Sequence, residues 1–133
     1  MNTILRDLIE HHIWANDTLL TYCEGLSPDQ LELTVPGTFG GAEATLAHVA
    51  ANEEHYLKLI DRSGVPTGIR TTLFDGEVPR KLASIRPVLE RTAAAWRDVV
   101  DQYPDNCMLA VEWEGAIQRL PLSDVVTQVV EHG

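Results

Sequence analysis

The sequence predicts an all-α fold, a four-helix bundle with a long loop between its second and third helices and a short hairpin before its last helix. Three observations predict it. Apolar residues recur at three-to-four spacing in separate segments. Stretches rich in Gly and Pro divide those segments. A chain of 133 residues can enclose one hydrophobic core but not two, so we expect a single domain over residues 1–133.

The first half of the chain predicts two helices. Residues 3–24 place seven apolar side chains on one helical face: Leu5, Leu8, Ile9, Ile13, Leu19, Leu20 and Cys23. Residues 27–29, Ser-Pro-Asp, predict a turn or a one-turn helix. The second long helix is expected over residues 42–61, with Glu43 in its first turn, where a negative charge suits the helix dipole. Residues 67–81 lack periodicity and predict a loop that crosses the domain.

The second half predicts a helix, a hairpin and a final helix. Ser84 is the expected N-cap of the third helix, which puts Pro87 at the third helical position, where a missing N–H costs little. This helix is expected to end near Tyr103. Alternating apolar residues within 108–120 predict a short hairpin that turns near a Gly. The valine-rich residues 122–133 predict the last helix, because Pro precedes them and Asp lies in the first turn.

Charge and composition exclude several classes of protein. The net charge of −10 opposes binding to nucleic-acid phosphate, and residues 1–61 carry ten Asp and Glu against Arg6 and Lys58. No apolar run is long enough to span a bilayer, and the N-terminus lacks the pattern of a signal peptide. We therefore expect a cytoplasmic protein that binds neither nucleic acid nor membranes. Cys23 and Cys107 form no metal or redox motif, and Cys23 is expected in the core.

Histidines on apolar helices are the candidate functional residues. His48 lies in an aliphatic segment, and Asn52 shares its helical face. A lone histidine in such a place is more often a hydrogen-bonded structural residue than a ligand. His55 is about 10.5 Å further along the helix, too far to close on one ion together with His48. The neighbouring Glu53 and Glu54 are expected on the solvated surface, because adjacent helical carboxylates point in different directions.

The first helix carries two more histidines. His12 joins the apolar face and is a candidate for the interior, either as a polar residue at the mouth of the bundle or as a functional one. His11 falls on a more polar side. Asn16 follows His12 by one turn, and an inward amide there would serve as a hydrogen-bond partner rather than as a metal ligand.

Three motifs together resemble the DinB family. They are His11-His12-Ile13-Trp14-Ala15-Asn16, Phe39-Gly40 followed by Thr45-Leu46-Ala47-His48, and the terminal Glu131-His132-Gly133. The resemblance runs in order along essentially the whole chain. The DinB family, in the DinB/YfiT-like group, also includes bacillithiol- and mycothiol-dependent S-transferases.

The resemblance implies a four-helix bundle, a homodimer, and a divalent metal held by three histidines. His48 matches the ligand from the second helix, and His132 matches the first histidine of an H-x-x-x-H pair whose partner would lie three residues beyond Gly133. The domain is therefore expected to be truncated at its C-terminus, with an incomplete site. Otherwise the site is degenerate, or His12 or a partner subunit supplies the third nitrogen.

The function implied by the resemblance is that of a divalent-metal-dependent enzyme acting on a small-molecule substrate, as a thiol-dependent S-transferase or a hydrolase. Imidazole ligands suit zinc or nickel, and an open coordination position would activate water or a low-molecular-weight thiol. The alternative is a non-catalytic, stress-responsive helical dimer with a degenerate metal site. No residue of the sequence identifies the substrate.

Overall fold

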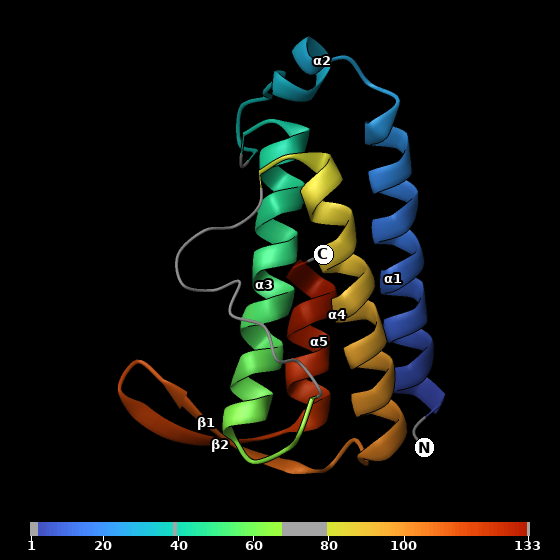
Figure 1. Cartoon of the computed structure of the whole chain (residues 1–133). Helices are drawn as coiled ribbons and strands as arrows, with labels where there is room; N and C mark the ends of the chain where they lie inside the picture. Colours follow the sequence, from blue (N-terminus) through green and yellow to red (C-terminus); the bar gives the residue numbers. More distant parts are fainter. Residues whose placement is uncertain (1–2, 39, 68–79, 133) are drawn as a thin grey trace.

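A computed structural model of the chain describes residues 3–38, 40–67 and 80–132, and it is mostly helical with one small sheet (Figure 1). None of the helices in these ranges has the length and apolar character needed to cross a membrane. The elements follow one another as α1 Thr3–Glu24, α2 Pro28–Glu32, α3 Ala42–Arg62, α4 Leu82–Gln102, β1 Met108–Trp113, β2 Ala116–Pro121 and α5 Leu122–His132.

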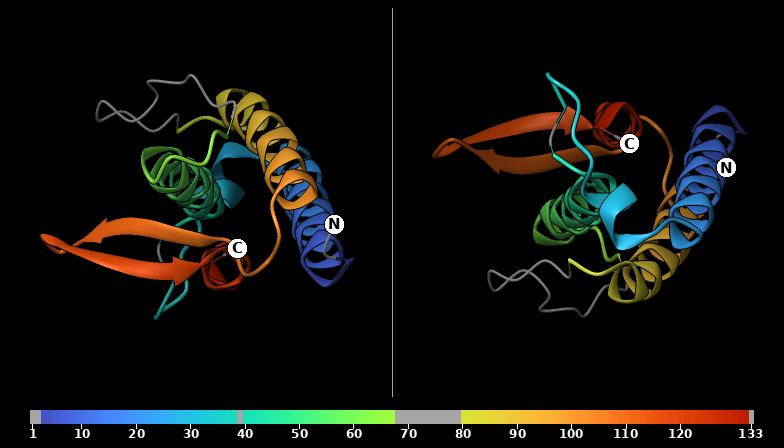
Figure 2. Two further views of the ribbon diagram at one scale, coloured as in Figure 1. Left: turned by 90° about the horizontal axis from the view of Figure 1, so that it is seen from below. Right: turned by 90° about the horizontal axis from the view of Figure 1, so that it is seen from above.

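The long helices α1, α3 and α4 lie side by side, and α5 packs against α1 and α3 (Figures 1 and 2). With 11 residues, α5 is about half as long as α3, and it ends beside the middle of that helix. The buried apolar residues form two clusters. One surrounds the fully buried Trp96 near the hairpin, and the other lies toward α2 and contains Cys23. The expectation that Cys23 is a core residue is thus confirmed.

The predicted bounds of α1 are confirmed, and those of α3 differ by one residue. The Ser-Pro-Asp segment forms the short helix α2, in which Ser27 and Gln30 cap each other's backbone N–H groups as a capping box. Gly41 is the N-cap of α3. A Cβ on Gly41 would lie 2.3 Å from the carbonyl oxygen of Leu31, so the close approach of α2 to α3 requires a glycine at this position.

The predicted start of α4 is wrong. This helix begins at Leu82, with Lys81 as its N-cap residue, so Ser84 and Pro87 both lie inside it. The capping acceptor comes from another helix: the Glu43 carboxylate accepts a hydrogen bond of 3.1 Å from the Leu82 N–H. Because Glu43 satisfies one of the four N–H groups left open at a helix start, α4 needs no Ser, Thr, Asp or Asn at its own N-cap.

The hairpin is confirmed. β1 and β2 pair antiparallel with Met108 opposite Pro121 and Trp113 opposite Ala116. Glu114 and Gly115 both have positive φ, 51° and 79°, as a two-residue type I′ turn requires. The strands project to one side of the helices (Figure 2). Their inner face buries Leu109 and Val111 against the Trp96 cluster, which holds the hairpin to the helices.

Some sequence predictions lie outside the described residues. They are Phe39 of the second motif, most of the expected loop (residues 68–79) and the terminal Gly133.

Candidate functional site

His48 is exposed on α3, and its Nε2 lies 3.1 Å from the amide nitrogen of Asn52, one turn further along. The expectation that the two residues share a face is confirmed. An amide N–H donates to an imidazole lone pair, so Nε2 would have to exchange Asn52 for an ion before it could ligate a metal. Asn52 thus fixes the orientation of the His48 ring.

His132 is the last described residue of α5 and is also exposed. Its Nδ1 lies 3.1 Å from the backbone carbonyl oxygen of Gln128. A carbonyl only accepts, so Nδ1 donates to it and Nε2 of the neutral ring keeps its lone pair, the state in which a histidine can ligate a metal. The His132 ring contacts the Tyr56 ring edge-to-face, with centroids 5.9 Å apart.

The contact with Tyr56 brings His132 to the helix that carries His48. Tyr56 follows His48 by eight residues, about 12 Å along the axis of α3, so a shared ion would require both histidine side chains to reach toward each other along this helix. The His55 ring packs against the rings of Tyr56 and Trp113, at centroid distances of 5.7 and 6.5 Å. Burial, helped by Arg62 and Lys58, lowers the pKa of His55, so this imidazole is neutral at neutral pH.

Two imidazoles are the right kind of donor for zinc or nickel, and the Nε2 of His132 is in a ligating state. Among the described residues, no group of three or more His, Cys, Asp and Glu side chains is placed to hold a metal ion. The described donors thus fit part of a metal site. The pairing of His48 with His132 stays a prediction.

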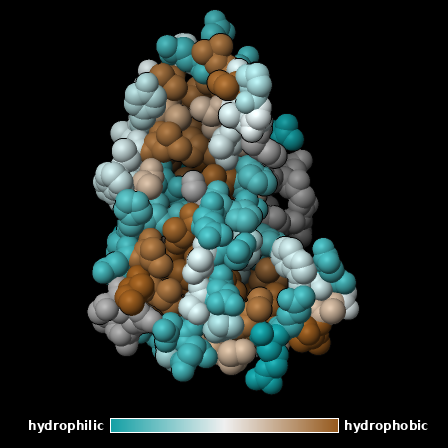
Figure 3. Space-filling view, turned by 180° about the vertical axis from the view of Figure 1, so that it is seen from behind, coloured by the Kyte–Doolittle hydropathy of each residue, from teal (hydrophilic) through white to brown (hydrophobic). Residues whose placement is uncertain are grey.

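A groove of about 410 Å³ lies next to His132, between α3, the hairpin and α5. It contains two residues that touch His132, Tyr56 and Gln128. Burial raises the pKa of Tyr56, so its phenol stays protonated. On the rear face, hydrophobic side chains are visible beside the hairpin (Figure 3). The groove is lined by Tyr56, Leu59, Val111, Trp113, Gln118, Leu120, Asp124, Val125, Thr127 and Gln128.

A second feature is a layer of four buried polar residues, which we call the polar layer: His12, Asn16, Glu53 and Thr92. Their exposed fractions are 3, 7, 3 and 0 %. Unpaired polar groups in such places cost several kcal/mol, of order 2–7. Here they satisfy one another. Glu53 Oε1 accepts from His12 Nε2 and, at 3.0 Å, from Asn16 Nδ2, while Oε2 accepts from the Thr92 hydroxyl at 2.6 Å.

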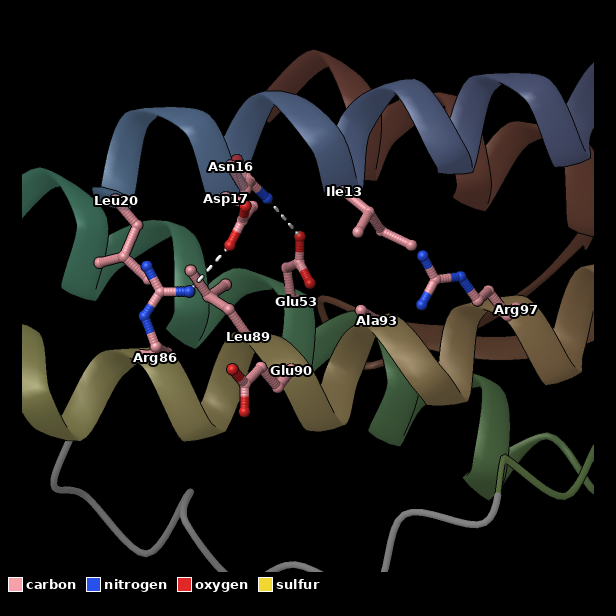
Figure 4. Close-up of a pocket in the computed structure, with 10 residues that line it drawn as sticks. All are labelled: Ile13, Asn16, Asp17, Leu20, Glu53, Arg86, Leu89, Glu90, Ala93 and Arg97. Carbon is pink, nitrogen blue, oxygen red and sulfur yellow. Dashed lines mark hydrogen bonds and ion pairs between the residues drawn. The ribbon is translucent and has the colours of Figure 1, made fainter. Parts of the chain in front are cut away.

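A cavity of about 230 Å³ opens onto the polar layer between α1 and α4 (Figure 4). Two members of the layer, Asn16 and Glu53, reach it. Apart from the exposed Glu90, the remaining walls are apolar or belong to ion pairs. They are formed by Ile13, Asp17, Leu20, Arg86, Leu89, Glu90, Ala93 and Arg97.

The prediction that Glu53 and Glu54 are solvated is wrong: both are buried, and Glu54 pairs with Arg91. The sequence held a signal for Glu53. The buried positions 46, 50, 53, 57 and 60 of α3 alternate spacings of four and three, so Glu53 occupies a core position. On α1, His12 and Asn16 fall in the same phase as the buried positions 5, 9, 20 and 23, so the interior placement of His12 and the inward amide of Asn16 are confirmed.

A family model described as the DinB family matches the chain over residues 1–133. None of the curated proteins matches it.

Proposed function

We propose that this chain, which belongs to the DinB family over residues 1–133, is a divalent-metal-dependent enzyme whose metal is held by His48 and His132. In this proposal α1, α3, α4 and α5 form a four-helix bundle, and the reaction is a thiol-dependent S-transfer or a hydrolysis of a small molecule. The observation that carries it is the hydrogen bond from His132 Nδ1 to the Gln128 carbonyl, which leaves Nε2 as the ligating atom of a ring that contacts Tyr56 of α3.

The protein's own residues would orient and shield the reaction. Gln128 holds the His132 ring through Nδ1, and His48 would exchange its hydrogen bond with Asn52 for the ion. Tyr56, protonated because burial raises its pKa, offers a hydrogen-bond donor beside His132. The groove with Trp113 would take the apolar part of the substrate and exclude water from it. A bound zinc or nickel ion would supply Lewis acidity, which lowers the pKa of a thiol or water.

Elemental analysis of tag-free protein tests the metal site. We expect stoichiometric zinc or nickel in the wild-type protein, and loss of that metal in His48→Ala and in His132→Ala. Both side chains are exposed, so these variants should keep the wild-type circular dichroism spectrum and melting temperature. His11→Ala, which removes an exposed histidine from α1, is the matched control and should keep its metal. Unchanged metal content in His48→Ala would remove His48 from the site.

A second candidate function is favoured by the lack of a three-donor group among the described residues. In it, the chain is a non-catalytic, stress-responsive helical dimer with a degenerate metal site. Wild-type protein would then hold metal below stoichiometry, and the His48 and His132 variants would not differ from it. Both candidates include a homodimer. The exposed aromatic residues Trp14 and Tyr22 on α1 support this part, which light scattering on the same samples measures.

A further inference from the structure

The cavity between α1 and α4 has a buried carboxylate at its base. Glu53 reaches across from α3 and lies between the two helices that form the walls (Figure 4). An ionised carboxylate has about four lone-pair positions for hydrogen bonds. His12, Asn16 and Thr92 occupy three of them. One acceptor position of Glu53 therefore remains for a donor that enters from the cavity.

The arginines of the cavity are already neutralised. Arg86 pairs with Glu24 and, at 2.8 Å, with Asp17, while Arg97 makes two hydrogen bonds to Glu10, of 2.8 and 3.0 Å. In both pairs the carboxylates come from α1, so each arginine joins the two walls. These guanidinium groups thus close the ends of the cavity and are poor receptors for an added anion.

The charge balance of the lining favours a cation. Of the three acidic residues, Asp17 pairs with Arg86, Glu53 at the base accepts a hydrogen bond from the imidazole of His12, and Glu90 lies at the rim. The apolar walls, Ile13, Leu20, Leu89 and Ala93, suit a short hydrocarbon. The cavity volume corresponds to roughly seven or eight water molecules at about 30 Å³ each, which limits the ligand to a small molecule.

We propose that this cavity is a binding site for a small primary ammonium ion with a short aliphatic body. The ammonium group donates to Glu53, and the hydrocarbon lies against Leu20, Leu89 and Ala93. A compact ammonium fits one free acceptor position better than a planar guanidinium, which matches a carboxylate with two parallel hydrogen bonds. The site is separate from the proposed His48–His132 centre, and neither proposal depends on the other.

Three probes of the same length separate charge from shape: n-butylammonium, n-butanol and n-butyrate. We titrate each into the full chain and follow backbone amides by NMR at constant pH and ionic strength. n-Butylammonium is expected to bind with a millimolar Kd, in keeping with about five heavy atoms, and to shift amides of α1 and α4 around Asn16 and Ala93. n-Butanol and n-butyrate should bind at least about tenfold more weakly.

Two variants of cavity residues and one control variant tie binding to the cavity. Glu53→Gln keeps the shape but removes the charge, and it should weaken n-butylammonium binding at least about tenfold. Glu112→Gln, on the exposed hairpin, makes the same change in net charge elsewhere and should bind as the wild type does. Ala93→Leu fills the cavity while keeping all four residues of the polar layer, and it should abolish binding, which keeps the test decisive if Glu53→Gln fails to fold.

Three results would overturn the proposal. The first is n-butyrate binding as tightly as n-butylammonium. The second is unchanged n-butylammonium binding in Ala93→Leu or in a folded Glu53→Gln. The third is that no amide of α1 or α4 shifts at tens of millimolar n-butylammonium.

Discussion

Thr92→Val tests the energetics of the polar layer with a change of almost constant shape. The substitution replaces the Thr92 hydroxyl by a methyl group at a fully buried position. The lost hydrogen bond, 2.6 Å to Glu53 Oε2, is the short kind that a hydroxyl makes to a carboxylate. Hydrogen bonds to charged groups contribute about 1.5–3 kcal/mol, so we expect a loss of about 2 kcal/mol in the free energy of unfolding.

Urea unfolding followed by circular dichroism measures this loss as a lower midpoint with an unchanged m-value. The melting temperature should fall by about 7 °C, at roughly 3–4 °C per kcal/mol for a chain of this length. Thr127→Val is the matched control, because the Thr127 hydroxyl donates to the Ser123 carbonyl on the exposed side of α5. That change should stay within about 0.5 kcal/mol. A Thr92→Val variant as stable as the Thr127→Val variant would refute the reasoning.

Two further predictions concern contacts between helices. Glu43→Ala removes the acceptor for the first N–H of α4 and should lower the free energy of unfolding by about 1 kcal/mol. Glu43→Gln keeps an oxygen acceptor and should lower this free energy by less. The urea midpoints of both variants measure the difference. Arg97 lowers the pKa of Glu10 through their hydrogen bonds, so this pair contributes stability above pH 4.5 that is lost as the pH falls through the lowered pKa of Glu10. As the pH is lowered from 6 to 3, the urea midpoint of Arg97→Gln should fall less steeply than that of the wild type. Equal pH dependence in the two proteins would contradict the stabilising role of the Glu10–Arg97 pair.

The bounds of most elements follow from local signals, and the start of α4 does not. Periodicity defined α1 and α3, and alternation with a Gly defined the hairpin, because each pattern lies within the element it describes. The acceptor that starts α4 lies 39 residues earlier, on Glu43. Ser84 looked like an N-cap because the nearest suitable side chain is the natural choice when only neighbours in sequence are considered. Local sequence patterns do not predict contacts between residues that are distant in the sequence.

The functional residues divide in the same way. Resemblance singled out His48 and His132, since nothing in their local pattern distinguishes a ligand from a solvated histidine. The predicted exposure of Glu53 is wrong because it follows from residue type, since glutamate is rarely buried, whereas the spacing of the apolar neighbours of Glu53 indicates a core position. Spacing alone could have found Glu53. It could not have found the acceptor position that remains on this carboxylate, which depends on donors from α1 and α4.

Stability alone does not explain the polar layer. Replacing a buried ionic network by apolar residues of similar volume is often neutral or stabilising, so a chain selected only for stability could place leucines at these positions. Mutual pairing does fix the register of α1, α3 and α4, because the Glu53 carboxylate meets all three donors in one alignment. Register, however, requires no cavity beside the carboxylate. The cavity of about 230 Å³ replaces packing between protein atoms that a larger residue at position 93 would supply. An open cavity next to a buried carboxylate is therefore better explained by a ligand than by the fold.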